Sequence, residues 1–179
     1  MRFGQKGNDM FKEIPLSTPN LSAEITDNLR ECIETGWVST GGRFIAEFEE
    51  KFAKYTGMES AVSTQSGTAG LHLALRALGI GPGDQVIVPT LTFVAAVAPV
   101  LYQNAIPVFM DCDDSLCMDM DKLEAYLKEN RGKVKAMIVV HIFGNLANME
   151  KLMALAAEYG IAVIEDATEA LGTVSTEGS

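Results

Sequence analysis

The spacing of apolar residues predicts two amphipathic helices in the first third of the chain. Apolar side chains of the first helix recur on one face, at Ile25, Leu29, Cys32 and Ile33. The second helix covers residues 44–55, and Gly57 is positioned to end it, because glycine readily adopts the left-handed conformation of a C-cap. The glycine-containing loop of residues 35–42 separates the two helices.

After residue 57 the pattern alternates between short apolar strands and helices. The predicted strands are residues 61–64, 85–88, 106–110, 136–140 and 161–164. The predicted helices are residues 67–78, 92–102, a segment around 123–127 capped by Asp119 or Asp121, and 149–159. Several strands are continuous apolar runs, which is typical of parallel strands buried on both faces. The chain is therefore expected to be α/β, with a three-layer α/β/α arrangement and a mostly parallel sheet.

Composition and charge limit the function. The chain has 179 residues, 47% of them hydrophobic, which is enough for a domain with a substantial core. Acidic residues outnumber basic ones by 24 to 14, giving a formal charge of −10. This surface repels phosphate backbones and anionic lipids, so neither nucleic acid nor a membrane is an expected partner. A small anion can still bind to backbone N–H groups.

The apolar runs and the cysteines of the sequence bear on the cellular compartment and on metal binding. Residues near the N-terminus include no apolar stretch of signal-peptide type, and the longest apolar run, residues 93–102, is too short to cross a bilayer. The three cysteines, Cys32, Cys112 and Cys117, are expected to be free thiols in a reducing cytoplasm. Because Cys112 and Cys117 lack a second Cys/His pair, no metal site is expected.

Three strand ends carry candidate chemistry, because ligands of open α/β sheets bind beyond the carboxyl ends of the strands. Residues 65–70 join a strand to a helix and contain two glycines and two hydroxyl residues, which suits a phosphate as well as an ordinary turn. Asp166 ends an apolar strand, where it could meet a cation, cap a helix or face solvent. Phe93 follows another strand, where it could stack on a planar ligand or belong to the core. A turn that can bind phosphate, an aromatic ring that can stack on a planar ligand and a carboxylate that can bind a ring cation together indicate a pyridoxal-phosphate pocket.

The sequence resembles the DegT/DnrJ/StrS family of PLP-dependent sugar aminotransferases, which have the aspartate-aminotransferase fold. The resemblance begins near Ile14 and is carried by TGWVSTG (35–41), FEEKFAKYTG (48–57), SGTAGLHLAL (66–75), GPGDQVIVP (81–89), HIFG (141–144) and VIEDA (163–167). The segments PNLS (19–22) and EDATEALG (165–172) are similar to enzymes of bacterial amino-sugar and nonulosonic-acid synthesis.

The resemblance implies a role for each candidate residue. Gly67 and Thr68 would hold the cofactor phosphate through backbone N–H and hydroxyl groups. Phe93 would stack on the pyridine ring, and Asp166 would bind its nitrogen. Glu169 occupies the place near the phenolic oxygen where the family often has Gln or His, so this residue departs from the pattern. The two histidines, His72 and His141, are expected to serve packing or hydrogen bonding.

The resemblance implies a Schiff-base lysine that follows the strand-end aspartate. The last lysine of the chain, Lys151, precedes Asp166, so the catalytic lysine is expected beyond Ser179. No catalytic residue is therefore assigned within the chain. Residues 1–20 are expected to be an N-terminal arm, and residues 21–179 an incomplete PLP-binding large domain that lacks later strands and a C-terminal small domain. By itself such a part is expected to be inactive.

The resemblance implies an aminotransferase that moves an amino group, from glutamate, to a nucleotide-linked keto-sugar, with PLP as cofactor and a homodimer as the working form. Its products would serve amino-sugar and cell-surface polysaccharide synthesis. The alternatives are a related sugar dehydratase, in which His replaces the Schiff-base lysine, and a non-catalytic fragment or regulatory protein of the same fold. An NAD-linked oxidoreductase is disfavoured because the G-x-G-x-x-G fingerprint is missing.

Overall fold

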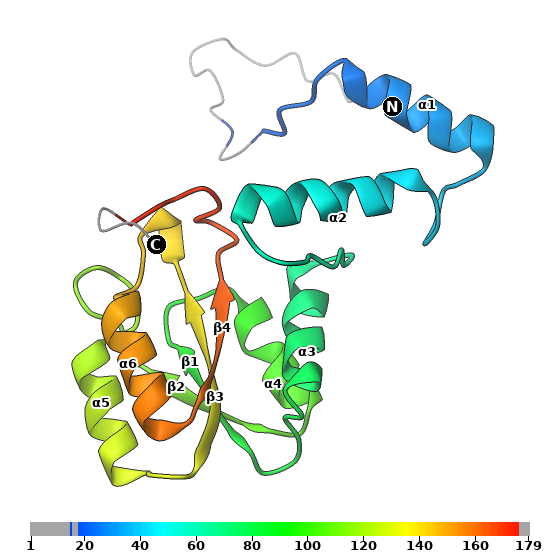
Figure 1. Ribbon diagram of the computed structural model, residues 1–179. Helices are drawn as coiled ribbons and strands as arrows, with labels where there is room; N and C mark the ends of the chain where they lie inside the picture. Colours follow the sequence, from blue (N-terminus) through cyan, green and yellow to red (C-terminus); the bar gives the residue numbers. More distant parts are fainter. Residues whose placement is uncertain (1–14, 16–17, 176–179) are drawn as a thin grey trace, which may run out of the picture. The chain divides into compact units, whose positions relative to one another are not determined.

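The computed structural model describes residue 15 and residues 18–175 (Figure 1). These residues form two compact units, the first ending at Phe48 and the second beginning at Glu49. Most of the predicted N-terminal arm lies outside the described residues, and the assignment of residues 21–179 to one large domain stays a prediction. None of the helices in the described part of the chain has the length and apolar content that crossing a bilayer requires.

The first unit contains α1 (Glu24–Thr35) and the beginning of α2 (Arg43–Thr56). Gly36 ends α1 in the left-handed conformation, with φ of 75°. Both helices appear where the apolar spacing predicts them. The apolar face of α1 is nevertheless uncovered: no residue of the helix is buried, and Leu29 and Ile33 are 59% and 73% exposed.

The second unit is built on a four-stranded parallel sheet, which confirms the predicted fold class. Its strands are β1 (Gln85–Pro89), β2 (Ile106–Met110), β3 (Val134–Val140) and β4 (Ala162–Asp166). Their order is β2-β1-β3-β4, so β1 and β3 are the central pair and β2 and β4 are the edges. Parallel pairing aligns Val140 with Asp166, which places the ends of β3 and β4 side by side.

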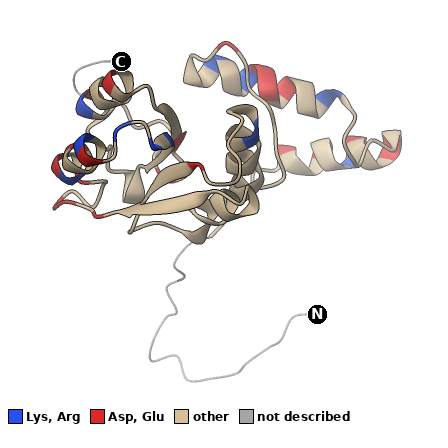
Figure 2. Cartoon of the chain, turned by 90° about the horizontal axis from the view of Figure 1, so that it is seen from below, with Lys and Arg blue, Asp and Glu red and all other residues tan. Residues whose placement is uncertain are grey.

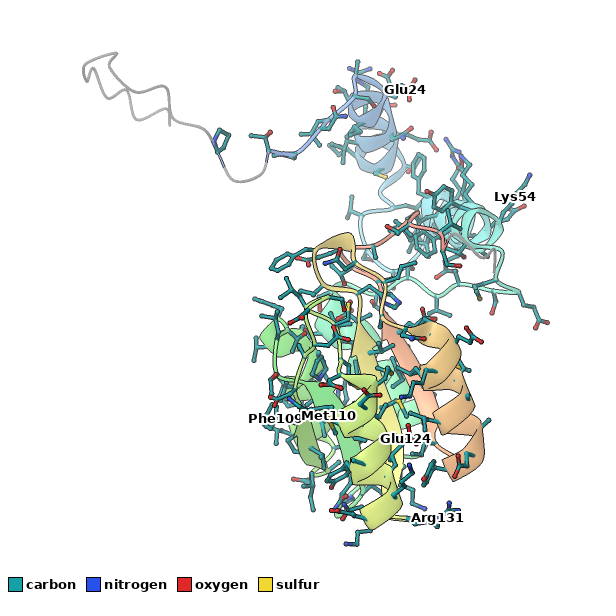
Figure 3. The ribbon with its side chains drawn as sticks, turned by 90° about the vertical axis from the view of Figure 1, so that its left-hand side faces the viewer. Glu24, Lys54, Phe109, Met110, Glu124 and Arg131 are labelled. Atoms are coloured by element: carbon teal, nitrogen blue, oxygen red, sulfur yellow. The ribbon has the colours of Figure 1, made fainter. Side chains whose placement is uncertain are left out.

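Helices cover both faces of the sheet, as the three-layer prediction requires. Helices α3 (Gly67–Ala77) and α4 (Ala98–Tyr102) lie on one face, and α5 (Met120–Glu129) and α6 (Met149–Tyr159) lie on the other (Figures 1 and 3). Charged residues of both signs occur along α5 and α6 (Figure 2). There Lys151 binds the carboxylates of Asp121 and Glu124 at 2.6 and 3.2 Å.

The core lies in the central strands, because these have helices on both sides. Val86, Ile87 and Val88 of β1 are fully buried, as are residues 136–139 of β3. Edge strand β2 is covered less evenly: Met110 is 5% exposed, whereas its neighbour Phe109 is 56% exposed (Figure 3). The continuous apolar runs of β1 and β3 thus follow from burial on both faces.

Two predicted elements are wrong in detail. Residues 61–64 form no strand, since no described strand lies beside them to complete a ladder; Ser63 instead donates its N–H and Oγ–H to Glu49 Oε1, both at 2.8 Å. The helix predicted over residues 92–102 is split into a 3₁₀ turn, Val94–Ala96, and α4. Pro99 explains the split, because a proline lacks an N–H and is tolerated only in the first turn of a helix.

Candidate functional site

The candidate site lies where the carboxyl ends of the parallel strands meet the start of α3. Phe93 follows β1, His141 follows β3, and Asp166 is the last residue of β4. The structure also brings the beginning of α3 to the turn after β4: a Cβ built on Gly67 would lie 4.0 Å from Thr168 Oγ1. Segments a hundred residues apart in the sequence therefore lie close together here, and Gly67 is near the turn that follows Asp166.

The N-terminus of α3 keeps two backbone donors available. Ser66 is the N-cap: its Oγ accepts the N–H of Ala69 at 3.2 Å, and its carbonyl accepts the N–H of Gly70 at 3.0 Å. Within the described residues no hydrogen bond uses the N–H groups of Gly67 and Thr68. Unpaired N–H groups and the positive end of a helix dipole together attract an anion. The geometry of this turn therefore suits a phosphate.

Asp166 is half-buried and is held by the turn that follows it. Its Oδ1 accepts the backbone N–H of Thr168 at 3.1 Å and the hydroxyl of Thr168 at 2.6 Å. This is an Asx-type turn, in which a carboxylate fixes the backbone two residues further on. Among the described residues nothing hydrogen-bonds to the second oxygen, Oδ2. One oxygen therefore orients the carboxylate, while the other can accept a bond from a ligand.

A buried histidine joins the ends of β3 and β4. His141 is 2% exposed, and its Nε2 lies 2.9 Å from Glu165 Oε2. This hydrogen bond holds the pKa of the Glu165 carboxyl below its ordinary value against the opposing effect of partial burial. His141 thus has the hydrogen-bonding role that sequence analysis expects of it.

Glu169 anchors the loop after β3. Its Oε2 accepts the backbone N–H of Phe143 at 2.6 Å. Phe143 adopts a left-handed conformation, with φ of 55° and ψ of 22°, which is uncommon for a residue other than glycine. The Glu169 carboxylate therefore helps to hold an unfavourable backbone geometry at the edge of the site. Its expected contact with a cofactor oxygen stays a prediction.

Phe93 is displayed to solvent. It is 76% exposed and precedes the 3₁₀ turn Val94–Ala96. The alternative that Phe93 belongs to the core is therefore wrong. An exposed aromatic ring just beyond a strand end is available to stack on a planar ligand.

The glycine-containing loop of the first unit forms a separate feature. A pocket of about 570 Å³ is lined by residues that include Trp37 and Arg43. A Cβ on Gly41 would lie 2.5 Å from the indole ring of Trp37, so a larger residue there would require the ring to move. Arg43 holds both carboxylate oxygens of Glu31, at 2.6 and 2.7 Å, which fixes the loop between α1 and α2.

Sequence reasoning missed the supporting roles of Ser66, Thr168 and Glu165. Local signals existed for the first two. A serine directly before a helix, as at position 66, is a common N-cap. An Asp followed two residues later by Thr, as at positions 166 and 168, is a signal for an Asx turn. The bond between His141 and Glu165 has no such signal, because it joins residues 24 positions apart.

Comparison with known proteins identifies a family. Residues 19–178 match the model of the DegT/DnrJ/EryC1/StrS aminotransferase family. GDP-perosamine synthase of Caulobacter vibrioides is 43% identical over 160 residues, which are 89% of this chain and 42% of that protein. The curated relatives named GDP-perosamine synthase are each matched over 42% to 44% of their length.

Solved structures give the same result. An aminotransferase from Psychrobacter cryohalolentis superposes with a TM-score of 0.79 at 32% identity, covering 88% of this chain and 40% of that one. The ntda protein of Bacillus subtilis, solved with bound PMP, superposes with a TM-score of 0.78 at 32% identity, covering 83% and 34%. The family resemblance drawn from the sequence is thereby confirmed: this chain belongs to the DegT/DnrJ/EryC1/StrS aminotransferase family.

Proposed function

We propose that this chain forms the cofactor-binding part of a PLP-dependent aminotransferase, which transfers an amino group from glutamate to a nucleotide-linked keto-sugar. One observation carries the proposal: the start of α3, with its free N–H groups, lies beside the turn that orients the Asp166 carboxylate, since a Cβ on Gly67 would lie 4.0 Å from Thr168 Oγ1. A phosphate and a protonated ring nitrogen are the two ends of pyridoxal phosphate, and this arrangement offers a partner to each.

The residues present fit the phosphate end of the cofactor. Gly67 and Thr68 would donate their backbone N–H groups, and the Thr68 hydroxyl would add a third donor. Ser66 takes up the next N–H of the helix, that of Ala69, and so keeps the first turn in shape. The absence of a side chain on Gly67 leaves the space toward Thr168 open for close approach.

The residues at the strand ends fit the ring. When bound, the cofactor supplies an electron sink for carbanion chemistry, which depends on a protonated pyridine nitrogen. Asp166 would hold that proton through its free Oδ2, while Phe93 would cover one face of the ring. Glu169 would lie near the phenolic oxygen. Lys151, the last lysine of the chain, forms ion pairs with Asp121 and Glu124. We assign it no role in catalysis.

The substrate class comes from the relatives. Several curated relatives are GDP-perosamine synthases, enzymes whose name identifies a nucleotide-linked amino sugar as product. We therefore infer that the complete enzyme serves amino-sugar synthesis for cell-surface polysaccharides. The chain spans about two fifths of those relatives, so the activity and substrates are inferred for the whole enzyme and not for this part alone.

The test is binding of pyridoxamine 5′-phosphate (PMP), measured by isothermal titration calorimetry. PMP is chosen because its amine cannot form imines with surface lysines. The chain is expected to bind PMP more tightly than inorganic phosphate, and Asp166→Asn is expected to weaken binding by about tenfold or more, because a neutral amide cannot stabilise a ring cation. The control Glu129→Gln removes one negative charge from an exposed position at the end of α5 and should leave binding unchanged.

Two results would contradict the proposal. One is a chain that binds PMP no better than phosphate. The other is Asp166→Asn binding PMP as well as the unaltered chain does. Asparagine retains an oxygen for the Thr168 hydrogen bonds, so loss of binding in this variant reports the lost charge rather than a broken turn.

We further propose a cytoplasmic homodimer. The exposed apolar side chains of α1, Leu29 and Ile33 among them, support an interface between copies of the chain. Free cysteines at positions 32, 112 and 117 support a reducing compartment. Sedimentation velocity over a range of concentrations should detect dimers. A monomer at every concentration would contradict the proposed homodimer.

A further inference from the structure

We propose that His141 and Glu165 form a positioning pair that fixes the direction of the Asp166 carboxylate. The inference rests on the proposed cofactor site and adds residues to it that do not themselves touch a ligand. It is carried by the hydrogen bonds that His141 makes to both Glu165 and the backbone of Asp166.

His141 forms hydrogen bonds with both of the last two residues of β4, Glu165 and Asp166. Its backbone N–H donates to the carbonyl of Asp166 at 3.1 Å, which continues the ladder between β3 and β4 by one bond. Its side chain reaches Glu165, the residue before Asp166, at 2.9 Å. A single residue at the end of β3 therefore holds the last two residues of β4.

The hydrogen bonds also determine the tautomer of His141. Its Nδ1 accepts the backbone N–H of Ala147 at 3.2 Å, so this nitrogen cannot carry a proton. The proton must then reside on Nε2, from which it is donated to Glu165. Because the imidazole is 2% exposed and bonded at both nitrogens, it is a rigid donor at a fixed place.

Fixing Glu165 affects Asp166 because successive side chains of a strand point to opposite faces. A strand end held through Glu165 on one face cannot turn freely, and the Asp166 side chain on the other face is constrained with it. Thr168 constrains the same carboxylate from the following turn, through Oδ1. Asp166 is thus held by the residue before it, Glu165, and by Thr168 in the turn after it, and its Oδ2 remains available to a ligand.

A second bond joins the same two segments. Glu169, after β4, accepts the N–H of Phe143 in the loop after β3. The segments carrying His141 and Asp166 are therefore tied together at two points. A merely structural pair would add stability without affecting what the Asp166 carboxylate can do, and the test separates these roles.

The test uses the 179-residue chain with Glu165→Ala, Glu165→Gln and His141→Phe, and Glu129→Ala as the matched control. Two quantities are measured: PMP affinity, and hydrogen exchange of the Thr168 amide in the cofactor-free chain, since this amide bonds to Asp166. Glu165→Ala and His141→Phe should each lower affinity by about tenfold and speed exchange of the Thr168 amide by a similar factor. Glu165→Gln retains an acceptor for Nε2 and should behave within about twofold of the unaltered chain.

The outcomes distinguish this inference from the proposed function. If Glu165→Ala only lowers the urea midpoint, with PMP affinity and Thr168 exchange unchanged, the pair is structural and the inference is wrong. If the unaltered chain binds no PMP, the proposed function fails. In that case, exchange at Thr168 still supports or overturns the claim that the pair holds Asp166. Imidazole ¹⁵N NMR gives a further check that does not require a folded His141 variant: a protonated Nδ1 would overturn the inference.

Discussion

Replacing Gly67 with alanine should separate binding from stability at the start of α3. Gly67 is the first residue of this helix, and it is absent from the glycines that have positive φ, so alanine can adopt its backbone conformation. The nearest atom to the added Cβ, Thr168 Oγ1, would lie 4.0 Å away, which is ordinary van der Waals contact. The variant should therefore fold.

The structure gives a direction and a size for each effect. Alanine restricts the unfolded chain more than glycine does, so Gly67→Ala should leave the free energy of unfolding unchanged or raise it by about 0.4–1 kcal/mol. The new methyl points toward Thr168 Oγ1, and on the proposed function it narrows the space left for a phosphate at the start of the helix. Loss of one hydrogen bond to a charged group costs about 1.5–3 kcal/mol, which corresponds to a roughly 10- to 150-fold weaker PMP affinity.

The assay pairs urea unfolding, followed by far-ultraviolet circular dichroism, with calorimetric titration of PMP. Gly81→Ala is the matched control, because Gly81 lacks a positive φ, has nothing within 4 Å of its added Cβ and lies in a turn before β1. The control should bind PMP normally. If Gly67→Ala also binds PMP normally, the N-terminus of α3 is not the phosphate site and the reasoning is refuted.

Three further predictions concern stability. Ser66→Ala leaves the N–H of Ala69 without its cap and should cost about 1 kcal/mol in urea unfolding, and an unchanged midpoint would contradict the capping role. The lowered pKa of Glu165, caused first by its bond to His141, stabilises the fold above the ordinary carboxyl value of 4.5; this contribution is lost as pH falls through the lower folded-state value. Unfolding measured against pH should therefore have a shallower acid slope in Glu165→Gln, and equal slopes would argue against the bond. Leu75→Ala, at a fully buried position, should lower the free energy of unfolding by about 2–5 kcal/mol, and a loss below 1 would mean that the core is looser than described.

Local signals were sufficient for most helices and strands of the second unit. Helix α6 begins after Asn148, whose side chain accepts the N–H of Lys151, and ends at the left-handed Gly160. Both caps can be read from the sequence, and the predicted bounds agree with the structure. Strand β2 is predicted to the residue for a similar reason, because it is a short apolar run between polar turns.

One of the two errors had a local signal, because Pro99 lies within the helix predicted over residues 92–102. The other arose where tertiary partners decide the structure. Residues 61–64 have strand-like composition, but a parallel strand requires a neighbour that is distant in sequence, and sequence pattern cannot supply it. The candidate site has the same limit. The positions of Gly67 and Asp166 at element ends were predictable, whereas the contact between His141 and Glu165 depends on the register of β3 against β4.

The pairing of Asp166 with a cofactor ring nitrogen can be measured directly. The measurement is the NMR chemical shift of PMP labelled with ¹⁵N in the pyridine ring, bound to the unaltered chain and to Asp166→Asn. The ring nitrogen should be protonated in the unaltered chain at a pH where that of free PMP is largely deprotonated, and this proton should be lost in the variant. A bound ring nitrogen that titrates like that of free PMP in both proteins would contradict the account.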